Sequence, residues 1–289
     1  MEIVIGKTAG FCYGVKRAIE GAKEELNEKK PVFCLGELVH NKQVIDNLKQ
    51  EGAIFIENIL DANEKGKVII RAHGVYKDVY EIAKKKDIEI KDYTCPNVLK
   101  IHSIAEEYSK KGYYIFLCGS KNHPENIGTI SFCGKNSAII ETEEDVFECL
   151  EQFKSTDIKK LLVISQTTYS LEKFYIIEEI IKNELKKDIE LVIKNTICKA
   201  TELRQKETLK ISKEVDYMII IGGKNSSNTK KLYEIAKKNC NNSICIETAE
   251  ELKLDDLKRK EKIGIMAGAS TPKESIDEVC IKLKSINHI

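Results

Sequence analysis

Short apolar runs alternate along this chain with longer segments in which apolar residues recur at helical spacing. The apolar runs predict strands at 3–5, 31–36, 67–72, 88–90, 113–119, 137–140, 161–165, 191–193, 217–223, 244–246 and 262–268. The helical pattern is found in VKRAIEGAKEEL, IHSIAEEYSKK, FYIIEEIIKNELKK, ETLKISKEV, TKKLYEIAKK and KESIDEVCIKLK. Because strands that alternate with helices of this length form parallel sheets covered by helices, we predict an α/β fold.

Three cysteines share one local setting, in which each follows a predicted strand and opens a helix: Cys12, Cys95 and Cys198. A strand that ends in glycine follows 24 residues after each cysteine, at Gly36, Gly119 and Gly222. Such self-similarity indicates repeated structural units. We therefore interpret the chain as three related α/β units with expected bounds of 13–94, 95–195 and 196–289. The N-terminal strand, 1–12, is expected near a central cavity.

Polar clusters recur at two further points of each unit. The first lies four residues after the glycine, at His40 in ELVHN, His123 in KNHPEN and Ser226 in KNSSN. The second follows the third strand, at His73 in RAHGV, Thr167 and Thr168 in SQTTYS, and Ser270 in AGASTP. In parallel α/β sheets the functional crevice lies at the carboxyl ends of the strands. Three units around a pseudo-threefold axis therefore bring cysteines, histidines and hydroxyls to one cavity.

The chain contains ten cysteines, and some of them are candidate metal ligands. The start MEIVIGKTAG lacks the features of an export signal, so we expect a cytoplasmic protein with reduced thiols rather than a disulfide framework. A helix N-terminus favours a thiolate, and three thiolates can hold three irons of a [4Fe–4S] cluster while the fourth iron stays open to substrate. Structural zinc usually takes four closely paired ligands, and no C-x-x-C pair is present. The alternative for Cys12 is a small residue that fills a tight turn.

The other seven cysteines have no shared setting and are expected to pack in the core: Cys34, Cys118, Cys133, Cys149, Cys240, Cys245 and Cys280.

The neutral donors at the strand ends suit an anionic ligand. Ser226, Ser227 and Asn228 stand in a glycine-rich turn, where hydroxyl, amide and backbone N–H groups fit a phosphate or diphosphate. Neither G-x-x-x-x-G-K-[ST] nor G-x-G-x-x-G is present, so a nucleotide is not indicated. Turn formation and helix capping also explain KNSSN and GASTP, and both interpretations can hold. Glu125, beside His123, is a natural proton donor near an open iron, or else an ordinary loop glutamate.

Taken together, the motifs GFCYGV, ELVHN, RAHG, TCP, HPE, QTT, TIC, KNSSN and GAS resemble those of the 4-hydroxy-3-methylbut-2-enyl diphosphate reductases, the IspH or LytB family of the methylerythritol phosphate route to isoprenoids. The resemblance runs from Cys12 to Pro272. It implies a trefoil of three α/β units around a [4Fe–4S] cluster held by Cys12, Cys95 and Cys198. One iron then has no protein ligand and takes the allylic hydroxyl of the substrate.

The resemblance also implies a role for each polar residue. Thr167 is placed near the substrate hydroxyl, His123 near both ends of the substrate, and Glu125 is the proton source. The diphosphate is held by His40, His73, Ser226, Ser227, Asn228 and Ser270, and Thr168 is placed with the substrate-binding residues. Two protons and two electrons, from a donor such as a ferredoxin or flavodoxin, then remove the hydroxyl as water and give isopentenyl and dimethylallyl diphosphates.

Two other functions stay open at this stage. An enzyme of the quinolinate synthase type also uses three cysteines and leaves one iron open, although its motifs differ. A non-enzymatic iron–sulfur sensor has no need of the donor-rich strand ends. The formal net charge of +1, with 32% charged residues, indicates neither a nucleic-acid nor a membrane partner, and the apolar runs are too short to span a bilayer.

Overall fold

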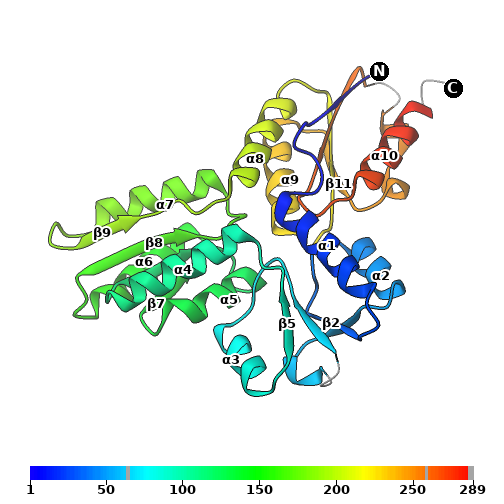
Figure 1. The fold of residues 1–289 in the computed structure, drawn as a ribbon. Coiled ribbons are helices and arrows are strands. Elements are labelled where there is room, and N and C mark those ends of the chain that lie inside the picture. The colour runs from blue at the N-terminus through cyan, green and yellow to red at the C-terminus, as the bar shows by residue number, and fades with distance from the viewer. Residues whose placement is uncertain (63–65, 258–259, 286–289) are drawn as a thin grey trace. The chain divides into compact units, whose positions relative to one another are not determined.

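The computed structural model describes residues 1–62, 66–257 and 260–285, and in these ranges it contains three four-stranded sheets in which every strand pairing is parallel (Figure 1). The predicted α/β fold with three parallel-sheet units is thereby confirmed. By their contacts the residues form two compact units, one made of 1–16, 39–47 and the chain from 199 onward, the other of 17–38 and 48–198. The bounds expected for three separate domains stay a prediction.

The first sheet lies in the unit of residues 17–38 and 48–198 and has the order β3-β2-β4-β5. Its strands are β2 (Val32–Leu35), β3 (Ile54–Ile56), β4 (Lys67–Ile70) and β5 (Glu89–Asp92). Apolar side chains of β2 and β4 pack with Ala83 of α3 (Lys77–Lys85) and with Ile59 of the short helix η1 (Ile59–Asp61). Because β3 is only three residues long and partly exposed, the apolar pattern did not predict it.

The second sheet lies in the same unit, with the order β7-β6-β8-β9. Its strands are β6 (Tyr114–Cys118), β7 (Ser137–Ile140), β8 (Lys160–Ser165) and β9 (Glu190–Ile193). Successive residues of a strand point to opposite faces. Phe116 accordingly packs with residues of α6 (Glu143–Lys154) and α7 (Leu171–Glu184), whereas Ile115 and Leu117 pack with residues of α4 (Pro96–Lys110) and α5 (Pro124–Cys133). The sheet is thus buried between two helical layers (Figure 1).

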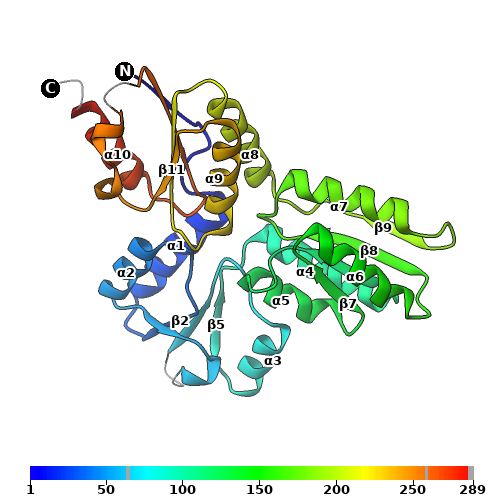
Figure 2. The ribbon, with the colours of Figure 1, turned by 180° about the vertical axis from the view of Figure 1, so that it is seen from behind.

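The third sheet lies in the other unit, with the order β11-β10-β12-β1. Its strands are β1 (Glu2–Ile5), β10 (Tyr217–Ile221), β11 (Ser243–Ile246) and β12 (Lys262–Ala267). One face packs on α8 (Lys199–Ser212) and α9 (Ser227–Asn239), and the other on α10 (Lys273–Ser285) and the short helices η2 (Ala249–Glu251) and η3 (Leu254–Leu257) (Figure 2). The N-terminal strand pairs in register with β12, as Ile3 opposite Ile263, and so completes this last sheet.

The three sheets share one strand arrangement, although β1 joins the third sheet from the start of the chain, and in each sheet the strand at one edge is followed by a cysteine. Cys12 follows β1, Cys95 follows β5 and Cys198 follows β9. The glycines found by spacing are also equivalent, because each N–H donates a hydrogen bond of 2.8 or 2.9 Å to the last residue of the neighbouring strand: Gly36 to Ile56, Gly119 to Ile140 and Gly222 to Ile246. The repeat inferred from the sequence is therefore a repeat of structure.

Four helices occupy segments for which the pattern predicted no helix. They are α2 (Lys42–Gln50), α3, α5 and α6, whereas α1 (Tyr13–Leu26) falls in a predicted segment. In α5 the reason is visible, since Glu125, Asn126 and Thr129 are buried together with Cys133. A helix that buries polar as well as apolar residues has no clear hydrophobic stripe. None of the helices in the described ranges is both long enough and apolar enough to cross a membrane.

Candidate functional site

The three predicted ligand cysteines have the same backbone environment. Each directly precedes a helix, which is α1, α4 or α8. Each donates its backbone N–H, over 3.0 Å, to a carbonyl just past the neighbouring strand: Cys12 to Ala269, Cys95 to Ala72 and Cys198 to Thr167. None of the three forms a disulfide, and all three are partly exposed. The local setting inferred from the sequence is confirmed, and a helix N-terminus is a favourable place for an anionic sulfur.

The remaining cysteines differ from these three in their burial. Six are buried, namely Cys34, Cys118, Cys133, Cys149, Cys240 and Cys280, while Cys245 is partly buried against the core. Burial raises the pKa of Cys34 and Cys133 to about 12 and that of Cys149 and Cys245 to about 11. Because metals bind the thiolate, these sulfurs are poor ligands, and the expectation that they pack in the core is confirmed.

Glu125 is a buried carboxylic acid in the first turn of α5. Its side chain accepts two hydrogen bonds of 2.6 Å, one from the backbone N–H of Thr167 and one from the Thr167 hydroxyl. Burial raises the pKa of Glu125 to about 7, although both hydrogen bonds from Thr167 act to lower it. Thr167 also accepts the N–H of Cys198, so the acid is connected through one residue to a candidate ligand. An acid with a pKa near 7 can give up a proton at neutral pH.

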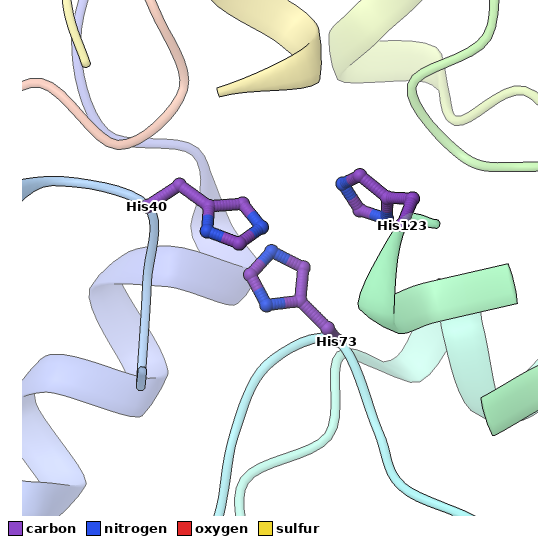
Figure 3. Close-up of side chains that lie close together, drawn as sticks. All are labelled: His40, His73 and His123. Carbon is purple, nitrogen blue, oxygen red and sulfur yellow. The ribbon is translucent and has the colours of Figure 1, made fainter. Parts of the chain in front are cut away.

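His123 begins the same helix. Its Nδ1 accepts the backbone N–H of Glu125 over 3.2 Å, so His123 caps α5. In the neutral imidazole the proton then resides on Nε2, which is the nitrogen that can donate to a ligand. The His73 ring, from the loop after β4, meets the His123 ring edge-on with ring centroids 5.4 Å apart (Figure 3). The structure thus brings these two predicted residues together. His40, the third histidine drawn in Figure 3, belongs to the other unit.

The side-chain amides of Gln166 and Asn126 form a hydrogen-bonded pair beside Thr168, which the sequence motifs did not identify. The Oε1 of Gln166 accepts hydrogen bonds from the Asn126 side chain, over 2.8 Å, and from the backbone N–H of Ser120, over 3.2 Å. The Nε2 of Gln166 donates to the Thr168 hydroxyl over 2.7 Å. Gln166 and Asn126 each stand next to a predicted site residue, and that adjacency was the available signal. Their pairing ties α5 to the loop after β8.

In the other unit, three of the predicted polar turns lie against one another. The Ser270 hydroxyl donates to the backbone carbonyl of His40 over 3.0 Å. The same carbonyl approaches Gly223 so closely that a Cβ there would come within 2.7 Å of it. Any larger residue at position 223 would push the His40 loop away. The turns ELVHN, GKNSSN and GAS therefore meet, as their places at strand ends predict.

The N-terminus of α9 carries the remaining candidates. The Ser226 hydroxyl accepts the N–H of Thr229 over 3.3 Å and caps the helix, which is the capping role expected for KNSSN. Ser227 is partly exposed, whereas Asn228 is only 3% exposed. No group in the described ranges forms a hydrogen bond with either polar atom of the Asn228 amide. A buried amide without partners is costly, so this side chain is suited to a polar ligand.

In the first repeat the cap lies one residue later than the spacing predicts. The side chain of Asn41, not that of His40, accepts the N–H of Val44 and begins α2. The loop between Gly36 and its helix is one residue longer than the loops after Gly119 and Gly222. The side chain of His40 therefore does not cap α2.

Comparison with known proteins gives one family and close relatives over the whole length. The family model described as "LytB protein" matches residues 3–284. A protein of Caldanaerobacter subterraneus subsp. tengcongensis, named 4-hydroxy-3-methylbut-2-enyl diphosphate reductase, is 47% identical over 99% of this chain and 98% of its own. A protein of Aquifex aeolicus with the same name is 39% identical over 99% and 97% of the two chains.

Two solved structures are similar to the present one. The first, "Structure of (E)-4-Hydroxy-3-methyl-but-2-enyl Diphosphate Reductase, the Terminal Enzyme of the Non-Mevalonate Pathway", has a TM-score of 0.71 and 39% identity, and the match covers 99% of this chain and 100% of that one. The second is the E-1-hydroxy-2-methyl-but-2-enyl-4-diphosphate reductase from Plasmodium falciparum, with a TM-score of 0.87, 34% identity and coverage of 99% and 87%.

Proposed function

Because this chain belongs to the LytB family, we propose that it removes the hydroxyl group of 4-hydroxy-3-methylbut-2-enyl diphosphate reductively and forms isopentenyl and dimethylallyl diphosphates. The balance is simple: two electrons and two protons enter, the C–O bond of the allylic alcohol breaks, a C–H bond forms, and water leaves. The electrons come from an external donor such as a ferredoxin or a flavodoxin. The protein must therefore supply a binding site for the diphosphate, a proton and a route for electrons.

The repeated cysteines fit an iron–sulfur cofactor. Cys12, Cys95 and Cys198 are the cysteines that combine partial exposure, a helix N-terminus and a backbone hydrogen bond that fixes the main chain beside the sulfur. Three thiolates are the ligand set of a [4Fe–4S] cluster with one iron that has no protein ligand. Such a cluster, when bound, supplies the electrons and a Lewis-acidic iron.

The diphosphate is assigned to the polar strand ends. Asn228 supports this assignment most directly, because its buried amide has no partner among the described residues and can donate to a phosphate oxygen. The first-turn N–H groups of α9 favour the same negative charge. His40, His73, Ser226 and Ser227 add further donors and Thr168 adds a hydroxyl, while Ser270, whose hydroxyl donates to the His40 carbonyl, completes the set of polar residues. Binding energy from this remote group positions the reacting carbon and oxygen.

Proton delivery is assigned to Glu125, with Thr167 and His123. The hydrogen-bonded pair of Glu125 and Thr167 is the observation on which the mechanism rests. A protonated Glu125 can donate to Oγ1 of Thr167, since only 2.6 Å separates the two oxygens, and the hydroxyl proton of Thr167 is then directed to the departing oxygen of the substrate. The backbone N–H of Thr167 holds the second carboxyl oxygen and fixes the geometry. His123 holds the N–H of Glu125 through Nδ1 and can present Nε2–H to the substrate.

A turnover experiment tests this function. Protein purified without oxygen is analysed for iron and sulfide, reduced, and given 4-hydroxy-3-methylbut-2-enyl diphosphate, and the products are separated by chromatography. We expect isopentenyl and dimethylallyl diphosphates from the iron-loaded protein and none from protein stripped by a chelator. Iron-loaded, reduced protein that leaves the alcohol unchanged would overturn the proposal.

A further inference from the structure

Two arginines stand on helices that begin at ligand cysteines, and each binds the loop in front of a different cysteine. Arg204 lies on α8, six residues after Cys198. Its Nη2 donates to the carbonyl of Gly10 over 2.6 Å, two residues before Cys12, and its Nη1 donates to the carbonyl of Ala200 over 3.1 Å. Arg204 is only 4% exposed. One guanidinium therefore connects the first turn of α8 to the loop that carries Cys12.

The loop before Cys12 depends on α8 at a second point. The Glu207 carboxylate accepts the backbone N–H groups of Lys7 and Thr8, both over 2.8 Å, and the hydroxyl of Thr8 over 2.5 Å. Gly10 has a φ of +98°, a conformation that side chains disfavour. Glu207 therefore holds the first part of this loop, at Lys7 and Thr8, and Arg204 holds the second part, at Gly10.

Arg17 makes the corresponding contact for the second cysteine. It lies on α1, five residues after Cys12. Its guanidinium donates to the carbonyls of Thr94, over 3.1 Å, and Asp92, over 3.3 Å, directly before Cys95. It also lies 5.5 Å from the centre of the Tyr93 ring. As at Arg204, the two arms of the fork take separate backbone carbonyls.

The third cysteine loop is held differently. Thr196, two residues before Cys198, accepts the N–H of Ser165 over 2.8 Å and donates to the Ser165 carbonyl over 2.5 Å. This loop is therefore fixed to the end of β8 in its own sheet, whereas the other two loops are fixed to helices that follow other cysteines.

We propose that Arg17 and Arg204 are positioning residues for the iron ligands. Each fixes the loop before one ligand cysteine to the helix that follows another ligand cysteine, so that the loops are ordered before metal binds. The proposal rests on the proposed function for the identity of the ligands. A lysine has the charge but lacks the rigid fork that spans two carbonyls. Loss of the guanidinium takes a donor from the buried carbonyl of Gly10, or from the partly buried carbonyls of Thr94 and Asp92, and frees the loop.

The test compares Arg204→Met and Arg17→Met with controls on the same helices, Lys210→Met and Lys23→Met, whose side chains are exposed. Two quantities are measured: amide hydrogen exchange of residues 7–12 and 92–95 in metal-free protein, and the rate of iron release to a chelator from loaded protein. We expect faster exchange in the loop that faces the changed arginine, and about 10- to 100-fold weaker retention of iron, as for other groups that orient metal ligands.

The conservative variants Arg204→Lys and Arg17→Lys give a second reading if a methionine variant does not fold. We expect them to lie between the parent and the methionine variants in both quantities. Exchange and iron release that equal those of the parent in all four arginine variants would overturn the proposal. If the parent itself holds no iron, the proposed function fails, but hydrogen exchange in the metal-free protein still decides whether the arginines order the loops.

Discussion

The backbone N–H and the hydroxyl of Thr167 both donate to the carboxyl group of Glu125, each over 2.6 Å. One residue thus holds both oxygens of a buried acid, and in the proposed mechanism its hydroxyl passes the proton of that acid to the substrate. The backbone N–H sets the geometry, and the hydroxyl can pass a proton. These two tasks can be separated by substitution.

Replacing Thr167 with valine should remove proton transfer but leave the backbone hydrogen bond. We expect kcat to fall about 10²- to 10⁴-fold in Thr167→Val, the range for loss of a general acid–base step, and to recover largely in Thr167→Ser. Thr129→Val is the matched control, because the buried Thr129 hydroxyl has no partner in the described ranges. Steady-state kinetics with a chemical reductant measure the effect. Equal kcat for Thr167→Val and the parent would remove the hydroxyl from the proton path.

The buried acid also makes stability depend on pH. Burial raises the pKa of Glu125 from its ordinary value of 4.5 to about 7, so between these values the folded protein binds more protons than the unfolded chain. The free energy of unfolding should therefore fall as pH rises from about 4.5 to about 7, by up to about 1.4 kcal/mol per pH unit, and then level off. Below about 4.5 both states are protonated and the contribution is fully present.

Denaturant unfolding of the parent and of Glu125→Gln across this range isolates the effect, because glutamine does not titrate. We expect the parent to lose stability relative to Glu125→Gln as pH rises, and to show no such trend relative to Glu143→Gln, which alters an exposed acid at the start of α6. A parent that gains stability relative to Glu125→Gln with rising pH would show that the carboxylate is the favoured form.

Much of this arrangement could be predicted from the sequence, because it depends on order along the chain. The constant spacing from each cysteine to a glycine identified three repeats, and parallel strands put Cys12, Cys95 and Cys198 at equivalent strand ends. The place of Glu125 beside His123 marked it as a candidate proton donor, whereas the burial that raises its pKa to about 7 is visible only in the structure.

The rest depends on contacts between distant residues and leaves no periodic signal. Arg204 meets Gly10 across 194 positions and Arg17 meets Thr94 across 77, and no local pattern indicates either pair. The pairing of β1 with β12 likewise joins the two ends of the chain. The shift of the α2 cap to Asn41 follows from one additional loop residue, which a count from Gly36 alone does not reveal.

The cysteine assignment predicts two groups of variants. Serine at Cys12, Cys95 or Cys198 should abolish or weaken retention of iron and sulfide, because an alkoxide is a poor substitute for a thiolate ligand. Serine at Cys34, Cys118 or Cys245 should leave the iron content unchanged, at a cost in stability for the two buried positions. Iron and sulfide analysis after oxygen-free purification distinguishes the groups. The same loss of iron in both groups would refute the assignment.

Replacing Asn228 with leucine should preserve or raise the stability of the protein but weaken substrate binding. Asn228→Leu removes a buried amide that has no partner in the part of the chain that the structure describes, so we expect an unchanged or raised melting temperature. If Asn228 binds the diphosphate as proposed, the same change removes a hydrogen bond worth roughly 1.5–3 kcal/mol, so KM should rise about 10- to 100-fold with little change in the cluster spectrum. Asn241→Leu, at an exposed asparagine, is the control. A KM equal to that of the parent would place the diphosphate elsewhere.

The central claim is that Glu125 supplies the proton for reductive removal of the hydroxyl, and a single-turnover measurement tests it most directly. Parent and Glu125→Gln are loaded with iron and sulfide, reduced beforehand, and mixed with one equivalent of 4-hydroxy-3-methylbut-2-enyl diphosphate. An excess of chemical reductant stays in the mixture, because the reaction takes two electrons, so that electron supply does not limit the rate. We predict that Glu125→Gln retains iron and binds substrate but forms product about 10²- to 10⁴-fold more slowly than the parent. Product formation at the parent rate would contradict the account, and His123 would then be the residue to examine.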